Sequence, residues 1–530
     1  MFPVLLFIIF VRLCTGLKHR ADSQALDFSD ANFFDVGFDL DINEAIEPSG
    51  HIDSFLQRVD RDDKSKGLHE FTPIQNTIGQ SQTQYYSFNV NTSSGLGEYY
   101  EFLIFLTGNI CSQPLNVKEN ETSLAVYYSF NLSMFSNFEI GQMVLYENGY
   151  FQALADVPVA ANSESDDLVL YIAVRAPQNT NTLAIWSYEI GVSQNDLVFQ
   201  WDDRTWASLV DTDPHSALIV TGNLTTKEDF NASSANATHS RYSLFIYDYQ
   251  YRDLFKQLNN SWCAVKNGPA LMSTSQFQRS YTTRGGGLQQ QFYVEGLNSS
   301  TKYVAYLVSN FGGSKFGGAV YQPFTFETMD EGPCLLLYDL DFCDQVAYSV
   351  PMPYGQSKEK LRDTYDNYAR EVYTNFSKAM DQISCETTND AIFSPVRTCD
   401  DCRNSYKNWL CSVMIPRCST RDIKGYKLRE VNNSRSDFIN QEIAPLDPYF
   451  EILPCVNVCQ AIVRDCPADF GFLCPTKNGS ISLSYYWDDG GEFPTCNYVG
   501  DVIATVSAAT RAILNWWMIM LMILALIITL

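Results

Sequence analysis

The chain has 530 residues, of which 45% are hydrophobic and 14% aromatic, so it holds enough apolar material for about three packed domains. Its formal net charge of −25 argues against nucleic acid or an anionic lipid surface as a partner. An acidic, solvated surface that keeps a secreted protein soluble accounts for this charge more simply.

The N-terminus has the pattern of a secretory signal. Residues 1–16 contain an apolar run followed by small residues, which predicts cleavage after Gly16. Because no Lys or Arg precedes Arg12, an uncleaved membrane anchor stays open as an alternative. In both cases we expect the chain to enter the secretory pathway.

Sequons for N-glycosylation occur along the whole chain, and none has Pro at its middle position. Many sequons on a chain with a secretory signal indicate a lumenal path, so we expect N-glycosylation. The eleven asparagines are Asn91, Asn120, Asn131, Asn223, Asn231, Asn236, Asn259, Asn298, Asn375, Asn432 and Asn478.

The cysteine count also fits an oxidising compartment. Of the 15 cysteines, Cys14 leaves with the signal, and the even number that remains is typical of a disulfide-bonded secreted protein. Most of them lie within residues 334–496, which predicts one disulfide-rich module there.

The C-terminal residues 512–530 form an apolar run. As a helix this run covers roughly 28 Å, close to the hydrocarbon thickness of about 30 Å. Small residues precede it, which is typical of a signal exchanged for a glycosylphosphatidylinositol (GPI) anchor, with Ser507 as the lipidated residue. A retained membrane helix is the alternative, and the sequence leaves both open. We assign residues 501–530 to this tail.

Between the two ends, residues 17–80 are acidic and show no sustained hydrophobic period, so we expect an irregular segment. Residues 81–330 consist of short aromatic and β-branched runs separated by Gly, Asn and Ser, which predicts an all-β region. This region is too long for one small sandwich, so we predict two sandwich-like domains, at 81–200 and 201–330.

The end of the second predicted sandwich resembles fibronectin type III domains. Residues 296–306 are similar to their penultimate strand, and residues 322–328 would be the closing strand. The resemblance implies that Tyr303 is a corner tyrosine whose hydroxyl ties a loop back to the backbone.

Two helices are predicted further on. Residues 357–383 place apolar side chains three or four positions apart, which indicates one buried helical face. These side chains are Leu361, Tyr365, Tyr368, Val372, Phe376 and Met380. The same spacing recurs at Cys455, Cys459, Ile462 and Cys466, so the three cysteines should point into a core.

The cysteine spacings of residues 331–500 resemble those of the frizzled-type cysteine-rich domain. Cys334-x8-Cys343 followed by DQVAY is similar to its opening pair, and Cys402-x8-Cys411 followed by IPRC to its central segment. The run PC-x3-C-x6-C that ends at Cys466 is similar to its late helix. The expected architecture is therefore multidomain: an all-β N-terminal part followed by a disulfide-rich, mainly α module.

The same resemblance implies a disulfide pairing, which spacing alone does not select. The implied pairs are Cys334–Cys418, Cys343–Cys411, Cys402–Cys466, Cys459–Cys474 and Cys455–Cys496, with Cys385–Cys399 as an added local pair and Cys111–Cys263 as the remaining one.

The order of parts resembles the fungal stretch-activated calcium channel regulatory subunits, the family named for mating-pheromone-induced death. Over the cysteine module alone, the chain is similar to the extracellular auxiliary subunit of the animal sodium leak channel. The resemblance implies a non-catalytic subunit on the outer face of the plasma membrane, and also in the endoplasmic reticulum membrane. Its implied partner is a pore-forming, four-repeat, voltage-gated-like calcium channel subunit, whose calcium influx it would support.

Other function classes have less support. No HExxH, GxSxG or Walker-type motif occurs, so we expect no enzyme, catalytic residue, metal or cofactor. Cys399-Asp-Asp-Cys402 has the spacing of a redox or zinc motif, but acidic residues in a secreted setting favour structural disulfides. The main alternative is a GPI-anchored receptor whose frizzled-like module binds a lipid or protein ligand.

Overall fold

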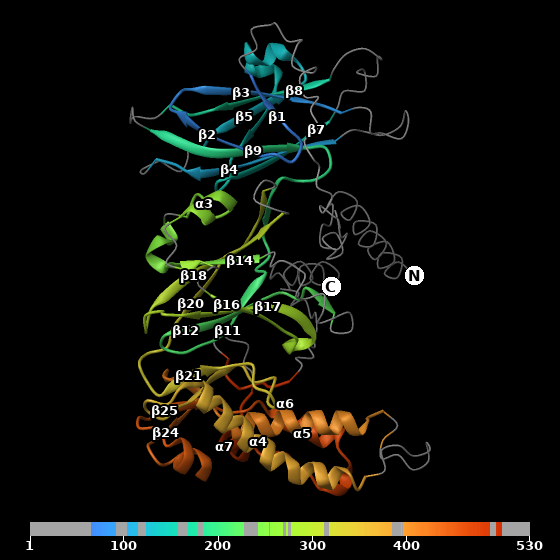
Figure 1. Ribbon diagram of the computed structural model, residues 1–530, viewed down its shortest axis with the longest axis vertical. Coiled ribbons are helices and arrows are strands. Elements are labelled where there is room, and N and C mark those ends of the chain that lie inside the picture. Colours follow the sequence, from blue (N-terminus) through green and yellow to red (C-terminus); the bar gives the residue numbers. More distant parts are fainter. Residues whose placement is uncertain are drawn as a thin grey trace, which may run out of the picture. The chain divides into compact units, whose positions relative to one another are not determined.

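The chain divides into two units, Met1–Asp63 and Lys64–Leu530. The computed structural model describes only residues of the second unit (Figure 1). The described residues are 65–91, 103–114, 123–156, 168–178, 184–226, 242–253, 255–268, 272–273, 277–311, 317–383, 394, 396–487 and 494–500. The predicted signal at 1–16 and the predicted tail at 501–530 lie outside them.

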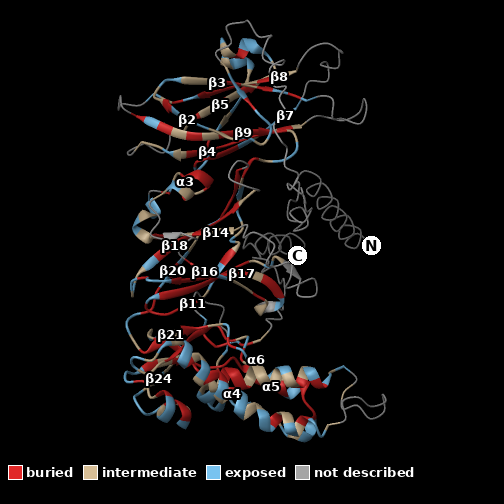
Figure 2. Ribbon diagram, viewed as in Figure 1, coloured by how far each residue is buried: buried red, intermediate tan, exposed pale blue. Residues whose placement is uncertain are grey.

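The first part of the described chain is a pair of sheets packed face to face. One sheet has the order β1-β3-β8-β5-β6 and the other β2-β9-β4-β7. Figure 2 shows buried residues along β4 and β9. The strands are β1 (Lys66–Leu68), β2 (Ile74–Gly79), β3 (Thr83–Asn89), β4 (Leu103–Ser112), β5 (Ala125–Ser129), β6 (Gln142–Leu145), β7 (Tyr150–Asp156), β8 (Val169–Arg175) and β9 (Ile185–Ser193).

The expectation of an irregular segment up to residue 80 is wrong for β1 and β2. β1 pairs in parallel with β3, and β2 pairs antiparallel with β9 along its whole length. Leu68 and Ile78 are buried in the same core, whereas polar residues occupy the exposed positions of β2. With one fully buried side chain per short strand, these strands carry too little apolar periodicity to be recognised from sequence.

A second pair of sheets follows. Its orders are β10-β19-β18-β14-β15, with β20 also on β18, and β11-β12-β17-β13, with β16 also on β17. The strands are β10 (Phe199–Asp202), β11 (Ala207–Thr212), β12 (Ser216–Thr221), β13 (Thr225–Thr226), β14 (Tyr242–Asp248), β15 (Met272–Ser273), β16 (Gln278–Thr282), β17 (Gly287–Glu295), β18 (Lys302–Asn310), β19 (Gly318–Tyr321) and β20 (Phe324–Glu327).

The two pairs of sheets are not independent sandwiches, because β18 is buried on both faces. Val304, Tyr306 and Val308 belong to the core of the first pair of sheets. The intervening Tyr303 and Leu307 belong to the core of the second pair. Successive side chains of a strand point to opposite faces, so this one strand serves two cores. The sequence predicts two sandwich-like domains, and in the structure the two pairs of sheets share β18 between their cores.

A short helix that the sequence analysis did not predict reinforces this junction. α3 (Trp262–Asn267) begins at Ser261, whose hydroxyl accepts a hydrogen bond from the Ala264 N–H at 3.1 Å. The Trp262 indole donates to the Ser309 carbonyl at the end of β18, at 3.2 Å. The disulfide Cys111–Cys263 ties α3 to β4.

The implied corner tyrosine is formed. The Tyr303 hydroxyl accepts a hydrogen bond from the Asn298 N–H at 2.9 Å, and the Tyr303 side chain is fully buried. β20 pairs with β18 as the predicted closing strand.

The cysteine-rich part combines helices with short strands. The strands are β21 (Cys334–Leu337), β22 (Tyr348–Pro351), β23 (Arg417–Ser419), β24 (Lys427–Arg429) and β25 (Tyr449–Ile452). The α-helices are α4 (Lys358–Met380), α5 (Cys399–Met414), α6 (Val456–Asp465) and α7 (Asn478–Ser484), and residues 439–443 form a π-helical turn. The remaining short helices of the described chain are the 3-10 turns η2 (Leu132–Phe135), η3 (Phe138–Ile140), η5 (Tyr249–Asp253), η7 (Arg284–Gly286) and η9 (Ala468–Phe470).

Candidate functional site: the cysteine-rich module

Helix α4 lies close to its predicted bounds. The Ser357 hydroxyl caps it by accepting from the Lys360 N–H at 3.3 Å. Of the predicted stripe, Leu361, Tyr365, Phe376 and Met380 are buried, whereas Tyr368 and Val372 are half-buried. Figure 2 shows both buried and exposed residues along α4 and α5. Two buried residues of α4, Ala369 and Asp366, were not predicted, and Asp366 is the charged one. The Asp366 carboxylate accepts hydrogen bonds from the N–H groups of Phe342 and Cys343, both at 2.8 Å, and so holds the chain after β21 against α4.

Disulfides join the elements of the module. Its five described pairs are Cys334–Cys418, Cys343–Cys411, Cys402–Cys466, Cys455–Cys496 and Cys459–Cys474. Together with Cys111–Cys263, they are six of the seven pairs that the frizzled-type resemblance implies. Cys399 is also disulfide-bonded, to a partner outside the described residues, where Cys385 lies.

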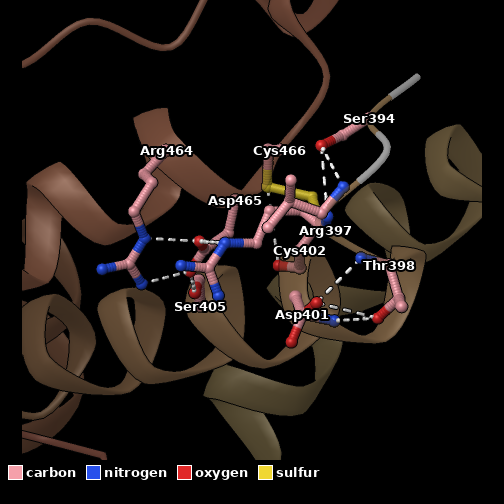
Figure 3. Close-up of polar contacts among 10 residues, drawn as sticks. Ser394, Arg397, Thr398, Asp401, Cys402, Ser405, Arg464, Asp465 and Cys466 are labelled. Atoms are coloured by element: carbon pink, nitrogen blue, oxygen red, sulfur yellow. Dashed lines mark hydrogen bonds and ion pairs between the residues drawn. A yellow bond between two sulfur atoms is a disulfide. The ribbon is translucent and has the colours of Figure 1, made fainter. Parts of the chain in front are cut away.

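The first turn of α5 explains how Cys399 and Cys402 are placed. Thr398 and Asp401 form a reciprocal capping box: the Asp401 N–H donates to Thr398 Oγ1 at 3.1 Å, and the Thr398 N–H donates to Asp401 Oδ2 at 2.8 Å (Figure 3). Because both cysteines are disulfide-bonded, neither offers a thiolate to a metal or a redox partner. The acidic residues between them serve the helix N-terminus.

A buried carboxylate, Asp465, connects three segments of the module (Figure 3). Arg464 pairs with both of its oxygens, at 2.6 and 2.7 Å, and Arg397 Nε lies 3.1 Å from Oδ1. The Ser405 hydroxyl of α5 donates to Oδ2 at 2.5 Å. The neighbouring Cys466 carries the disulfide to Cys402, so a covalent bond and an ionic network join α5 and α6 at the same place.

The donors around Asp465 decide its protonation. Burial would raise the pKa of this carboxyl, but the hydrogen bonds from Arg464 and Ser405 and the charges of Arg464 and Arg397 together lower its pKa. Both oxygens are occupied by donors, so the group has no acceptor left for substrate or cation chemistry. We assign it a structural role.

A second buried carboxylate pair attaches the module to the second pair of sheets. Asp211 Oδ2 on β11 accepts from Arg417 Nε of β23 at 3.0 Å and from the Ser349 N–H of β22 at 3.1 Å. Asp213 Oδ2 accepts from the Leu336 N–H of β21 at 2.9 Å. Each of these acids thus satisfies backbone or side-chain donors across the junction, which favours a fixed geometry between the two parts.

Lys358 lies at the same junction. Its Nζ is 3.4 Å from the centroid of the Tyr293 ring on β17 and 4.5 Å from that of Tyr338. Burial lowers the pKa of Lys358 to about 8. The first residue of α4 is therefore held by aromatic faces from both sides of the junction.

The small sheet β23-β25-β24 holds another buried carboxylate, Glu451. Arg429 Nη2 and Arg435 Nε lie 2.6 and 3.0 Å from its oxygens. The side chain is 1% exposed, so the two guanidinium groups rather than water neutralise it. These ion pairs keep the loop from β24 to the π-helical turn on the sheet.

The described residues contain one cluster with metal-ligand spacing, Cys111, Glu189 and Cys263. Its two cysteines form a disulfide, so the cluster does not provide the thiolates that a metal would need. Burial raises the pKa of the Glu189 carboxyl.

The predicted modification sites are scattered over the surface rather than gathered into one site. Six of the asparagines are exposed and Asn259 is partly buried, with its Oδ1 accepting from the Tyr306 hydroxyl at 3.0 Å. The exposed six are Asn91, Asn131, Asn223, Asn298, Asn375 and Asn432. Asn478 is the first residue of α7, whereas Asn120, Asn231, Asn236 and the lipidation candidate Ser507 lie outside the described residues.

Sequence reasoning did not single out the half-buried Lys358 or the buried charges, namely Asp211, Asp213, Asp366, Arg417, Glu451 and Asp465. The adjacent residues do not distinguish them from surface charges, because at least one partner of several of them is distant in the chain. Arg417 and Asp211, for example, are 206 positions apart.

Within the described ranges, none of the helices combines the length and apolar character that crossing a membrane requires.

Comparison with known proteins places these features in context. The model of a family described as "Stretch-activated Ca2+-permeable channel component" matches residues 103–502. The "Stretch-activated cation channel MID1" of Saccharomyces cerevisiae is 38% identical, over 82% of this chain and 87% of that protein. The "Stretch-activated cation channel yam8" of Schizosaccharomyces pombe is 31% identical, over 78% and 82%.

Among solved structures, the glycoside hydrolase domain of Endo-D from Streptococcus pneumoniae R6 matches with a TM-score of 0.18 and 10% identity, over 48% of this chain and 32% of that one. A likeness this low carries no argument about the fold or the activity.

Proposed function

Since the chain belongs to the family of stretch-activated Ca2+-permeable channel components, we propose that it is a non-catalytic, extracellular auxiliary subunit of a pore-forming, four-repeat, voltage-gated-like calcium channel. In this role it supports calcium influx across the plasma membrane, including influx activated by stretch. It holds the pore subunit in a competent state and has no ion pathway of its own.

The observation that carries the proposal is the extent of the family match. Residues 103–502 include the first pair of sheets from β4 onwards, the whole second pair and the cysteine-rich module, so the likeness concerns most of the described architecture and not one widespread domain. The relatives named as stretch-activated cation channels are likewise covered over most of their length.

The architecture supports a docking role. Six described disulfides and the buried pairs at Asp211, Glu451 and Asp465 give a preorganised surface, and a preorganised surface loses less entropy on binding. We propose that the cysteine-rich module is frizzled-like and contacts the channel. We also propose that residues 501–530 attach the chain to the membrane, through a lipid anchor at Ser507 or a retained helix.

A pore made by this chain alone is less favoured on physical grounds. A conduction path needs several segments that satisfy their backbone in lipid and enclose a polar route. Residues 512–530 are the one apolar run of spanning length that follows the predicted signal, and Asn515 and Thr529 are its polar side chains. A ring of such tails would offer no carboxylates to select calcium.

The deciding experiment is calcium uptake in cells that express this chain and the four-repeat channel separately and together. Uptake should require both, and the chain should co-purify with the channel from native membranes. Stretch-gated current from the purified chain alone in bilayers would overturn the proposal. A lipid that binds the isolated protein, with no channel in the complex, would instead favour the alternative of a GPI-anchored receptor.

A further inference from the structure

A cleft in the first pair of sheets has no part in the proposed channel role. It has a volume of about 610 Å³ and opens between β1, β3, β4 and the end of β9. Clefts that hold small ligands typically measure about 300–1,000 Å³. Polar groups such as His69, Asn89 and Gln194 line it together with the apolar Leu103 and Phe105.

The electrostatics of the cleft select a neutral ligand. Glu70 supplies the carboxylate, but its oxygens accept from the Ser193 hydroxyl at 2.7 Å, the Gln194 N–H at 3.0 and 3.1 Å, and the Asn195 amide at 2.9 Å. These donors occupy Oε1 and part of Oε2, so a cation would compete with them for the carboxylate. An anion would be repelled by the same carboxylate. A neutral molecule with hydroxyl or amide groups and apolar faces fits the lining, and a sugar has this chemistry.

One source of such a molecule is fixed at the rim. Asn91 lines the cleft, is exposed, and begins the sequon Asn91-Thr92-Ser93. Its backbone is clamped by a single side chain: the Asn91 N–H donates to Gln194 Oε1 at 2.8 Å, and Gln194 Nε2 donates to the Asn91 carbonyl at 3.1 Å. Because Glu70 holds Gln194 in turn, the asparagine keeps one position relative to the cleft.

We propose that the N-glycan of Asn91 folds back into this cleft and that its first sugars are an integral part of the first pair of sheets. The apolar faces of the sugars pack on Phe105 and Leu103, and their hydroxyl and acetamido groups bond to the polar rim. This inference rests on the secretory route of the proposed function, because the glycan is added there.

The covalent step is ordinary N-glycosylation. A lipid-linked oligosaccharide donates its first sugar to Asn91 Nδ2, the bond from that sugar to the lipid diphosphate breaks, and the amide proton leaves with the diphosphate. The docked glycan then bridges the end of β3 and the end of β9. It thereby adds to the connection that the Gln194 side chain makes with Asn91.

The test compares two sequons on the full-length protein purified from native membranes. An endoglycosidase that cuts between the two core sugars is applied under native conditions, and glycopeptides are quantified by mass spectrometry. The control is Asn375, which is exposed on α4. If the Asn91 glycan is docked nine-tenths of the time, its release should be about tenfold slower than that at Asn375. After denaturation the two rates should be equal.

Two variants separate docking from the mere presence of the glycan. Asn89→Trp fills the cleft from an exposed lining position and leaves the sequon intact, so the Asn91 glycan should become as susceptible as the control. Ser93→Ala removes the glycan while keeping Asn91, and should lower the thermal midpoint more than Asn375→Gln does. Equal release at both sites in the native protein, or an unmodified Asn91 among occupied sequons, would overturn the proposal while leaving the channel role intact. A protein with no occupied sequon would refute the secretory route itself.

Discussion

The sheet region and the cysteine-rich module reach a fixed structure by different physical means. In residues 65–328 two large cores hold the sheets, and Cys111–Cys263 is the one disulfide described there. In residues 334–500 one core is comparable in size to the second sheet core, the other buried apolar residues lie in smaller clusters, and five described disulfides link these clusters. Continuous burial stabilises the first region, whereas crosslinks and buried ion pairs stabilise the second.

The difference follows from the geometry of the elements. Long paired strands present continuous faces, so side chains from distant parts of the chain share one core. Helix α4, part of α5 and the strands β21 and β22 share one core, but α6, α7 and the other elements of the module meet at smaller clusters. A small core supplies little stability, and disulfides compensate by restricting the unfolded chain.

The sharpest test of this contrast is a core truncation in the sheet region. Trp186 on β9 is fully buried, so Trp186→Ala should destabilise the protein by about 3–5 kcal/mol. The matched control, Ile185→Ala, changes a side chain that is 59% exposed and should stay within about 0.5 kcal/mol. Denaturant unfolding followed by circular dichroism measures both, and equal effects would mean that burial does not dominate this region.

Removing a disulfide should destabilise the cysteine-rich module more than it destabilises the sheet region. Replacing Cys343 and Cys411 together by Ser should cost about 2–4 kcal/mol and expose the amides of α4 and α5 to hydrogen exchange. The same double change at Cys111 and Cys263 should loosen α3 and the end of β4 but leave the remaining sheet amides protected. Global unfolding of the second variant would contradict the idea that its core suffices.

A smaller effect is expected at the junction of the two regions. Arg417→Ala leaves Asp211 buried without its ionic partner, at a cost of about 1–3 kcal/mol. Adding Asp211→Asn should restore part of this loss, since the two groups are coupled. Lys424→Ala, on an exposed residue of the same segment, is the control. If the losses of stability from the two changes simply add in the double variant, the ion pair contributes little to the stability of the junction.

The weakest of the expected effects is a pH dependence within the module. Because the pKa of Asp465 is lowered from its usual 3.8, its ionised form stabilises the folded state above that pH and this contribution is lost as the pH falls through the lower, folded-state value. Asp465→Asn should therefore be less stable than the parent at neutral pH, and the difference should shrink in acid. A difference that is constant with pH would assign the effect to packing alone.

The elements with a strong local signal were predictable from sequence. The six spaced apolar residues of α4 gave its bounds to within a few positions. The corner tyrosine was predicted from the residues around Tyr303, because this short segment resembles the corresponding strand of fibronectin type III domains.

Features set by distant partners were not predictable. The strands β1 and β2 become strands only because β3 and β9 offer them edges to pair with. The double burial of β18 depends on α3 and the first pair of sheets, which lie on its other face. Likewise Glu70 and Gln194 read as surface residues, and their role at the cleft requires the end of β9 to meet the end of β3.

The disulfide Cys111–Cys263 has a mechanical consequence. Tension applied to the chain before Cys111 and after Cys263 passes through the sulfur bridge and bypasses the intervening residues, whose sequence separation is 152. At about 3.3–3.6 Å per residue, the segment that the bridge keeps from extending would be on the order of 500 Å long when stretched. In a family of stretch-activated channel components, tension along the chain would then be transmitted without extension of this segment. Single-molecule extension before and after reduction would measure the length released.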